Sequence, residues 1–233
     1  KNYKLLKQLM EKYDSELTFS EKKTVYLYAI NYCGAQIGLS QNKIYYVEEC
    51  LELYMIGINQ EFFLVDNYLS PWTFKNVVKL AMNLKRYDFT ENFIQENYQK
   101  LEKESQEDAL HFSLADLFYQ KKDFKAAQLH LIQVQYSDIF YKIDAKILLL
   151  KIYFETLEIE ALLSLIASLS ILLRRNNQIS SELKTAYLNF TSLLSKVIRT
   201  KKDRMPTVIE KIKNTNPLTN RSWLLSICKK PIF

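Results

Sequence analysis

The chain has 233 residues, of which 48% are hydrophobic, and a formal net charge of +6. This length and composition exclude an intrinsically disordered protein and are sufficient for a sizeable core. Only three glycines and four prolines are present, too few for the tight turns of an all-β or doubly wound fold. The composition therefore predicts an all-α chain whose helices are joined by short polar turns.

The N-terminal half begins with helical patterns that differ from those in the middle of the chain. Apolar residues recur every three or four positions, which predicts helices over residues 2–13, 21–39 and 41–58 and a short one over 60–68. Ser70 and Pro71 then suit the N-cap and the first position of a further helix.

The clearest helix pair lies in the middle of the sequence. Asp108 is expected to begin a helix that turns Leu114, Ala115 and Phe118 inward, and a second helix follows from Phe124. On that second helix we expect Ala127, Leu131 and Val134 to face the first. Small residues at positions 115 and 127 would let the two helices approach closely.

Related patterns occur on both sides of this pair. Thirty-five residues later, Leu149, Leu150 and Tyr153 take the positions of Leu114, Ala115 and Phe118. Thirty-four residues earlier, the positions are filled by Leu80, Ala81 and Leu84, followed by a turn resembling that of residues 121–124. We therefore expect repeats over 72–105, 107–136 and 142–174, and atypical C-terminal helices over 179–229.

These residues resemble tetratricopeptide repeats in a degenerate form. The stretch from Tyr187 through Arg204 to Leu225, which includes Asn216-Pro217 and Trp223, is also similar to the end of an uncharacterised bacterial family of helical-repeat proteins. The resemblance implies a single domain over residues 1–233, an α-α superhelix or solenoid of about a dozen antiparallel helices. It implies a bacterial intracellular origin and no particular activity.

The cysteines and the longest apolar stretch indicate where in the cell the protein is expected. Cys33, Cys50 and Cys228 are odd in number, lack any CxxC spacing and fall within apolar helical patterns, which favours reduced thiols in a cytoplasmic protein. Residues 161–173 are too few for a membrane helix of about 20 residues and predict a buried helix. We therefore expect no membrane partner.

No residue pattern indicates catalysis, a metal or a cofactor. The two histidines, His111 and His130, lack a convergent set of Cys, Asp or Glu, and the repeat register places His130 on an exposed helix side. Three scattered glycines cannot form either of the common phosphate-binding loops. In each adjacent pair, Tyr45-Tyr46 and Phe62-Phe63, at least one ring should point away from the main apolar stripe, toward a concave binding surface or a neighbouring helix. Trp223 should anchor the last helix.

Basic residues are concentrated at the C-terminal end. Residues 174–233 contain 13 Lys and Arg against three acidic residues, and a field of this kind favours acidic partners. The densest part comprises Arg199, Lys201, Lys202, Arg204, Lys211 and Lys213. A solvated cap of the solenoid, an acidic protein partner and nucleic acid are alternative explanations of this patch.

The sequence thus predicts a non-enzymatic interaction or scaffold module that holds a peptide or helix of another protein in a concave groove. The first helices of the repeats should line that groove, with Asn76, Asn83, His111 and Lys146 directed at the partner. The alternative is a nucleic-acid-binding repeat protein that uses the basic end. A nucleotide-dependent or metal-dependent enzyme is not expected.

Overall fold

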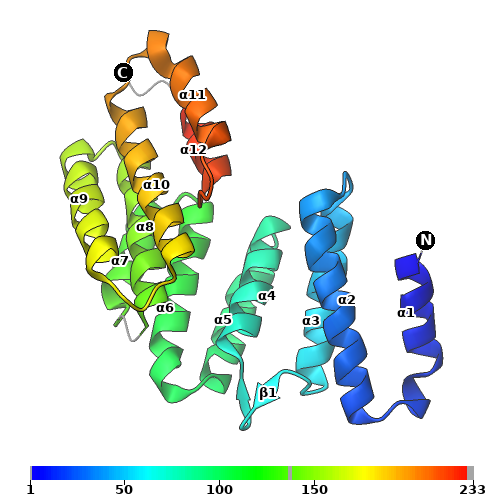
Figure 1. Ribbon diagram of the computed structural model, residues 1–233. Helices are drawn as coiled ribbons and strands as arrows, with labels where there is room; N and C mark the ends of the chain where they lie inside the picture. Colours follow the sequence, from blue (N-terminus) through cyan, green and yellow to red (C-terminus); the bar gives the residue numbers. More distant parts are fainter. Residues whose placement is uncertain (1, 136–137, 230–233) are drawn as a thin grey trace. The chain divides into compact units, whose positions relative to one another are not determined.

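A computed structural model of the protein describes residues 2–135 and 138–229 (Figure 1). Over these residues it contains twelve α-helices, three short 3-10 helices and one two-stranded hairpin. The all-α fold class is therefore confirmed. The chain divides into two compact units, residues 1–137 and 138–233, and each is described by itself. The expected single repeat domain and its superhelix stay predictions.

In the first unit, each helix from α2 to α6 packs on the next one along the chain, and α4 also packs on α6. The elements are α1 (Asn2–Lys12), η1 (Asp14–Glu16), α2 (Phe19–Leu39), α3 (Lys43–Asn59), β1 (Leu64–Val65), β2 (Tyr68–Leu69), α4 (Pro71–Asn83), α5 (Tyr87–Asn97), η2 (Tyr98–Lys100), α6 (Lys103–Gln120) and α7 (Phe124–Gln133).

The second unit has a single hydrophobic core to which every α-helix contributes. Its elements are α8 (Ile139–Glu155), α9 (Ile159–Arg175), α10 (Ser181–Arg199), η3 (Lys202–Arg204), α11 (Met205–Asn214) and α12 (Arg221–Ile227). Helix α9 buries Leu162, Ile166, Leu169 and Leu173 but exposes Ile171. The helix expected over residues 161–173 therefore lies within α9, and one of its faces is buried in the core.

Trp223 of α12 contributes to the same core, as predicted for an anchor of the last helix. Its ring packs edge-on against Phe154 of α8, with centroids 5.5 Å apart, and 6.1 Å from Phe190 of α10. Because Phe190 is fully buried, the indole ties α12 to the centre of the unit.

The predicted pair in the middle of the chain is confirmed as α6 and α7. Ala115 and Ala127 are completely buried, and Leu114, Leu131 and Val134 are also in the core. Helix α6 begins at Lys103 rather than at Asp108. Asp108 is instead buried within the helix and accepts a hydrogen bond of 2.6 Å from the Gln135 amide, so its carboxylate holds the chain that leaves α7.

The predicted helix over residues 60–68 is wrong. Asp66 and Asn67 both have positive φ, 50° and 68°, and they form the tight turn between β1 and β2. Two consecutive left-handed residues favour a hairpin turn and are incompatible with a helix. Phe62 and Phe63 are both buried, against rings of α2 and α3, so of the two expected alternatives this pair contacts neighbouring helices.

Helices α4, α6 and α8 end in the same turn, each at a residue that is not glycine. Lys85, Lys122 and Leu157 have φ of 56°, 63° and 61°. After each, the next amide bonds a carbonyl five residues earlier, as in Asp123 to Phe118, which is the Schellman arrangement. The turns that end α4 and α6 are 37 residues apart, and those that end α6 and α8 are 35 residues apart. The step of 34 residues expected between the first two repeats is therefore wrong.

Replacing Leu157 by glycine is expected to raise the free energy of unfolding by about 0.5 to 1 kcal/mol. Leu157 is 63% exposed, so little packing is lost, whereas the strain of a side chain at φ 61° is removed. Chemical denaturation monitored by circular dichroism measures the change. The matched control is Leu129→Gly, at an exposed position inside α7, which should lower stability. A loss in both variants would contradict the prediction.

Candidate functional site

A cavity of about 400 Å³ opens between α2, α3 and α4 in the first unit. Its size lies within the range of ligand pockets in proteins. Helix α2 supplies one wall, α4 the opposite wall, and α3 lies between them. The lining residues are Ile30, Asn31, Gly34, Ile37, Cys50, Tyr54, Asn76, Lys79 and Leu80.

The α2 wall is uncharged and partly apolar on its outer side. No charged residue lies between Lys23 and Lys43, and the exposed large side chains of α2 in this interval are Leu27, Tyr28, Tyr32 and Leu39. Exposed apolar side chains that gather on one surface mark an interaction site more often than isolated ones. Of these side chains, Tyr32 stacks on Tyr3 of α1, whereas Leu27, Tyr28 and Leu39 leave apolar surface of α2 exposed.

Gly34 gives this wall its shape. A β-carbon at Gly34 or at Gly38 would have no heavy atom within 4 Å, so the packing of the protein does not require glycine at either position. Glycine inside a helix costs about 0.5 to 1 kcal/mol relative to alanine. What Gly34 provides is a bare backbone surface in the cavity, where another chain can approach closely.

The α4 wall carries the polar groups. Asn76 Nδ2 donates a hydrogen bond of 2.9 Å to the Tyr54 hydroxyl of α3, which fixes the amide at the cavity surface. Lys79 lies one turn further along α4 and is exposed, as is Asn31 on the α2 wall. These three side chains can bind polar groups of a ligand, whereas Ile30, Ile37 and Leu80 offer apolar contact.

The cavity has little that could support acid-base or nucleophilic chemistry. Burial, together with a smaller contribution from Cys33, raises the pKa of the Cys50 thiol to about 12, so the thiol stays protonated near neutral pH. Burial also raises the pKa of Tyr54, although the hydrogen bond with Asn76 opposes the shift. The arrangement is suited to binding rather than to catalysis.

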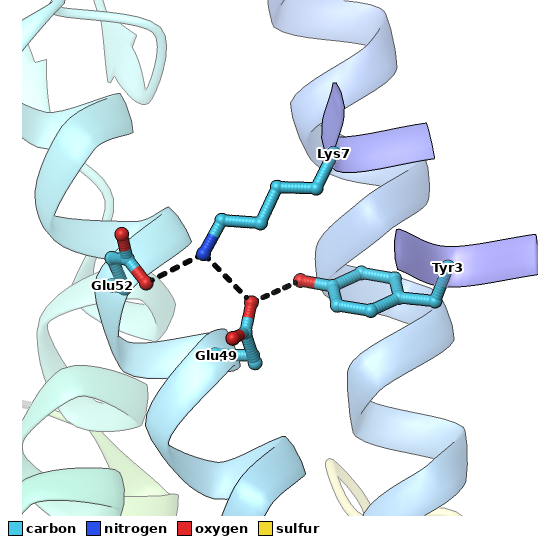
Figure 2. Close-up of polar contacts among 4 residues, drawn as sticks. All are labelled: Tyr3, Lys7, Glu49 and Glu52. Atoms are coloured by element: carbon cyan, nitrogen blue, oxygen red, sulfur yellow. Dashed lines mark hydrogen bonds and ion pairs between the residues drawn. The ribbon is translucent and has the colours of Figure 1, made fainter. Parts of the chain in front are cut away.

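A second polar cluster holds α1 against α3 (Figure 2). Tyr3 donates a hydrogen bond of 2.9 Å to Glu49, and Lys7 lies 3.0 Å from Glu49 and 2.8 Å from Glu52. Burial raises the pKa of Tyr3. Burial opposes the charge on Lys7, yet the hydrogen bonds and charges of both glutamates raise its pKa. Because these charges are paired with one another, the cluster stabilises the position of α1.

Tyrosine rings extend this contact between α1, α2 and α3. Tyr3 stacks on Tyr32 with centroids 5.6 Å apart and meets Tyr46 edge-on at 6.2 Å. Tyr45 and Tyr46 are both partly buried, and their rings contact each other at 5.1 Å. The aromatic residues in this part of the chain therefore pack helices together.

The structure brings only one of the four predicted partner-binding residues to the cavity. Asn76 lines it. Asn83 is exposed at the end of α4, two helical turns beyond Asn76 on the same side. Lys146 belongs to the second unit and is half-buried, and burial together with the charge of Lys142 lowers its pKa. The four-residue set as a whole stays a prediction.

His111 instead contacts His130. Their Nδ1 atoms are 3.1 Å apart, and Phe118 stacks on His130 with ring centroids 5.4 Å apart and ring planes 6° apart. The expected exposed position of His130 is wrong, because this ring is partly buried between α6 and α7. Burial lowers the pKa of His130, and the charge of His111 lowers it further.

The six residues of the predicted basic patch are all exposed. They lie at the end of α10, directly before and within η3, and on α11. They are Arg199, Lys201, Lys202, Arg204, Lys211 and Lys213. Lys213 lies 3.7 Å from Glu210. Arg221, which follows in the sequence, has a different role. Its guanidinium donates hydrogen bonds to the backbone carbonyls of Ile212, Lys213 and Thr215.

Sequence reasoning missed the α2 wall, including Ile30, Asn31, Gly34 and Ile37. A usable signal was present, since two glycines lie inside a long uncharged helical pattern where neither a turn nor a helix end is expected. Lys79 was missed because the sequence does not show which helices pack beside α4 to form the cavity. The apolar periodicity of one sequence shows which face of a helix is buried, but not which other helix lies opposite that face.

Comparison of the chain with protein-family models, with curated proteins and with solved structures found no match. Within residues 2–135 and 138–229, no helix has the length and apolar character needed to cross a membrane. In the same ranges, no group of three or more His, Cys, Asp or Glu side chains is arranged to hold a metal ion.

Proposed function

We propose that the protein is a non-enzymatic interaction module in which the cavity between α2, α3 and α4 binds a peptide or helix of another protein. The observation that carries the proposal is the bare backbone at Gly34 in a cavity of about 400 Å³, whose apolar lining includes Ile30, Ile37 and Leu80. Helix-in-groove recognition needs apolar contact together with close approach of the two backbones. Both are available at this wall.

The chemistry of the lining indicates what the partner offers. Ile30, Ile37 and Leu80 suit aliphatic or aromatic side chains, and Asn31 and Asn76 can bond peptide groups of the partner. Lys79 adds one positive charge at the rim, which favours a carboxylate on the partner. The proposed ligand is therefore an amphipathic segment with an acidic residue or a C-terminal carboxylate. The unpaired cysteines favour a cytoplasmic location for this encounter.

Replacing Gly34 by leucine is expected to reduce partner binding at least tenfold, because the new side chain occupies the cavity without meeting the protein's own atoms. Affinity capture from the native cell, with quantitative mass spectrometry and with nuclease in one arm, identifies partners that depend on the cavity. Titration of the best partner with wild-type protein and variant then gives the ratio of affinities.

The matched control is Gly38→Leu, on the same helix and equally open, but outside the cavity lining. It should fold like Gly34→Leu and retain most of the binding. If Gly34→Leu captures and binds the same proteins as the wild type, the cavity is not the interaction surface. If both variants lose binding equally, the outer side of α2 rather than the cavity binds the partner.

The basic patch supports a second candidate function, the binding of nucleic acid. Six exposed cationic side chains lie close together in the sequence and on consecutive elements, and such a field attracts phosphates. Binding through phosphate contacts should weaken steeply as salt rises. If association with single-stranded or double-stranded nucleic acid is absent at low salt, or unchanged between low and physiological salt, this candidate is excluded.

A further inference from the structure

Two histidines on neighbouring helices of the first unit face each other through the same ring nitrogen. His111 lies on α6 and His130 on α7, and the distance between their Nδ1 atoms is 3.1 Å. They are the only histidines in the sequence, and the proposed cavity uses neither. Between two neutral imidazoles, one Nδ1 hydrogen must bond to the lone pair of the other nitrogen.

The spacing of the two nitrogens fits a bound transition-metal ion. Bonds of about 2.1 Å from a metal to each imidazole nitrogen, spanning this distance, would meet at an angle of about 95°. That angle lies between the values for square or octahedral coordination and for tetrahedral coordination. Each metal–nitrogen bond would lie about 40° from the line that joins the two nitrogens, so both rings must rotate from their hydrogen-bonded orientation to direct their lone pairs at one ion.

Neighbouring side chains contact both rings and limit their orientations. Glu107 Oε2 lies 3.4 Å from His111 Nε2, one helical turn earlier on α6. A carboxylate at the far nitrogen of a ligating histidine orients the ring and keeps the proton on that nitrogen. Phe118 restricts the orientation of the His130 ring, since its own ring lies parallel to the imidazole.

We propose that His111 and His130 form a binding site for one divalent transition-metal ion, such as Zn²⁺, Ni²⁺ or Cu²⁺, bound through both Nδ1 atoms. Imidazole nitrogen prefers these ions, whereas Mg²⁺ and Ca²⁺ prefer oxygen. Two protein ligands leave the other coordination positions to water. The ion would cross-link α6 to α7, and both rings are partly exposed, so it can enter from solvent.

The protons balance without any further reactant. For both Nδ1 lone pairs to be free, each ring must carry its proton on Nε2. The ring that donates in the neutral pair therefore transfers its proton from Nδ1 to Nε2 through solvent, and no net proton is released. A pair that begins singly protonated releases one proton as the ion binds. On His111, the Nε2 proton then faces Glu107.

Isothermal titration of the full chain with ZnCl₂ and NiCl₂, without an oligohistidine tag, tests the proposal. We expect one ion per chain and an affinity at least tenfold higher than in His111→Gln and in His130→Phe. His130→Phe keeps an aromatic ring against Phe118, so loss of packing is limited. Equal affinities in the wild type and the variants would overturn the site, and MgCl₂ should give no binding heat.

Two further measurements keep the proposal testable if a histidine variant fails to fold. Electron paramagnetic resonance of the wild-type protein with one equivalent of Cu²⁺ should show two nitrogen ligands, and a spectrum with one or none would contradict the proposal. Cys228 is the partly exposed cysteine among the three. Binding should persist in Cys228→Ser, and its loss there would place the ion at the thiol instead.

Discussion

Replacing Arg221 by methionine is expected to lower the free energy of unfolding of the second unit by about 2 to 4 kcal/mol. The guanidinium donates to the carbonyls of Ile212, Lys213 and Thr215 and to Asn216 Oδ1. The first two carbonyls belong to the last turn of α11, where no further helical amide can reach them. Methionine keeps most of the length of the side chain but leaves these oxygens without their donor.

Denaturant unfolding measured by the fluorescence of Trp223, with the exposed Trp72 of the first unit replaced by phenylalanine in every variant, reports on this unit because the indole packs on Phe154 and Phe190. Arg221→Lys should fall between the wild type and Arg221→Met, since one ammonium cannot reproduce the planar fork of five donors. Arg175→Met, at an exposed end of α9, is the matched control and should change stability by less than about 0.5 kcal/mol. An Arg221→Met variant as stable as this control would show that the bonds contribute little.

Replacing Gly57 by alanine is expected to lower the free energy of unfolding by about 2 kcal/mol. A β-carbon there would lie 2.2 Å from Cε2 and 2.4 Å from Cζ of Phe63. The Phe63 ring is buried and packs against Tyr54 with centroids 5.6 Å apart, so it cannot move aside without disturbing its neighbours. The strain of overpacking exceeds the helical preference for alanine.

The other two glycines supply the control for this prediction. Gly34→Ala and Gly38→Ala should each raise the free energy of unfolding by about 0.5 to 1 kcal/mol, because their β-carbons meet open space. The comparison uses three identical substitutions, two on α2 and one on α3, measured by denaturant unfolding. If Gly57→Ala is also stabilising, the Phe63 ring is free to move and the packing argument fails.

The helices were largely predictable because each buries one face and so carries a clear period. The predicted ranges over residues 2–13, 21–39 and 41–58 correspond to α1, α2 and α3, and α4 begins at Pro71 after Ser70 as predicted. Helix ends were less predictable. At Glu61, Lys85, Lys122 and Leu157 the left-handed residue is not glycine, so the usual stop signal was missing.

The candidate site was predictable only in part, because a cavity depends on which helix faces meet. Asn76 could be placed on a first helix from its spacing, but its bond to Tyr54 and its position opposite Gly34 join three helices. The histidine pair shows the same limit. Nineteen residues separate His111 from His130 in the chain, and only the packing of α6 on α7 brings their nitrogens together.

The sequence by itself determined that this protein is all-α, where most of its helices lie, and that its cationic residues gather at the C-terminal end. These properties follow from local periodicity and composition, which every stretch of the chain carries with it. The tertiary structure alone decided that Phe62 and Phe63 are both buried beside a hairpin and that Gly57 has no room for a side chain while Gly34 does. It also decided that Arg221 closes the end of α11 rather than joining the basic surface. Each of these outcomes depends on a contact between residues from different elements, and contacts of that kind leave no period in the sequence.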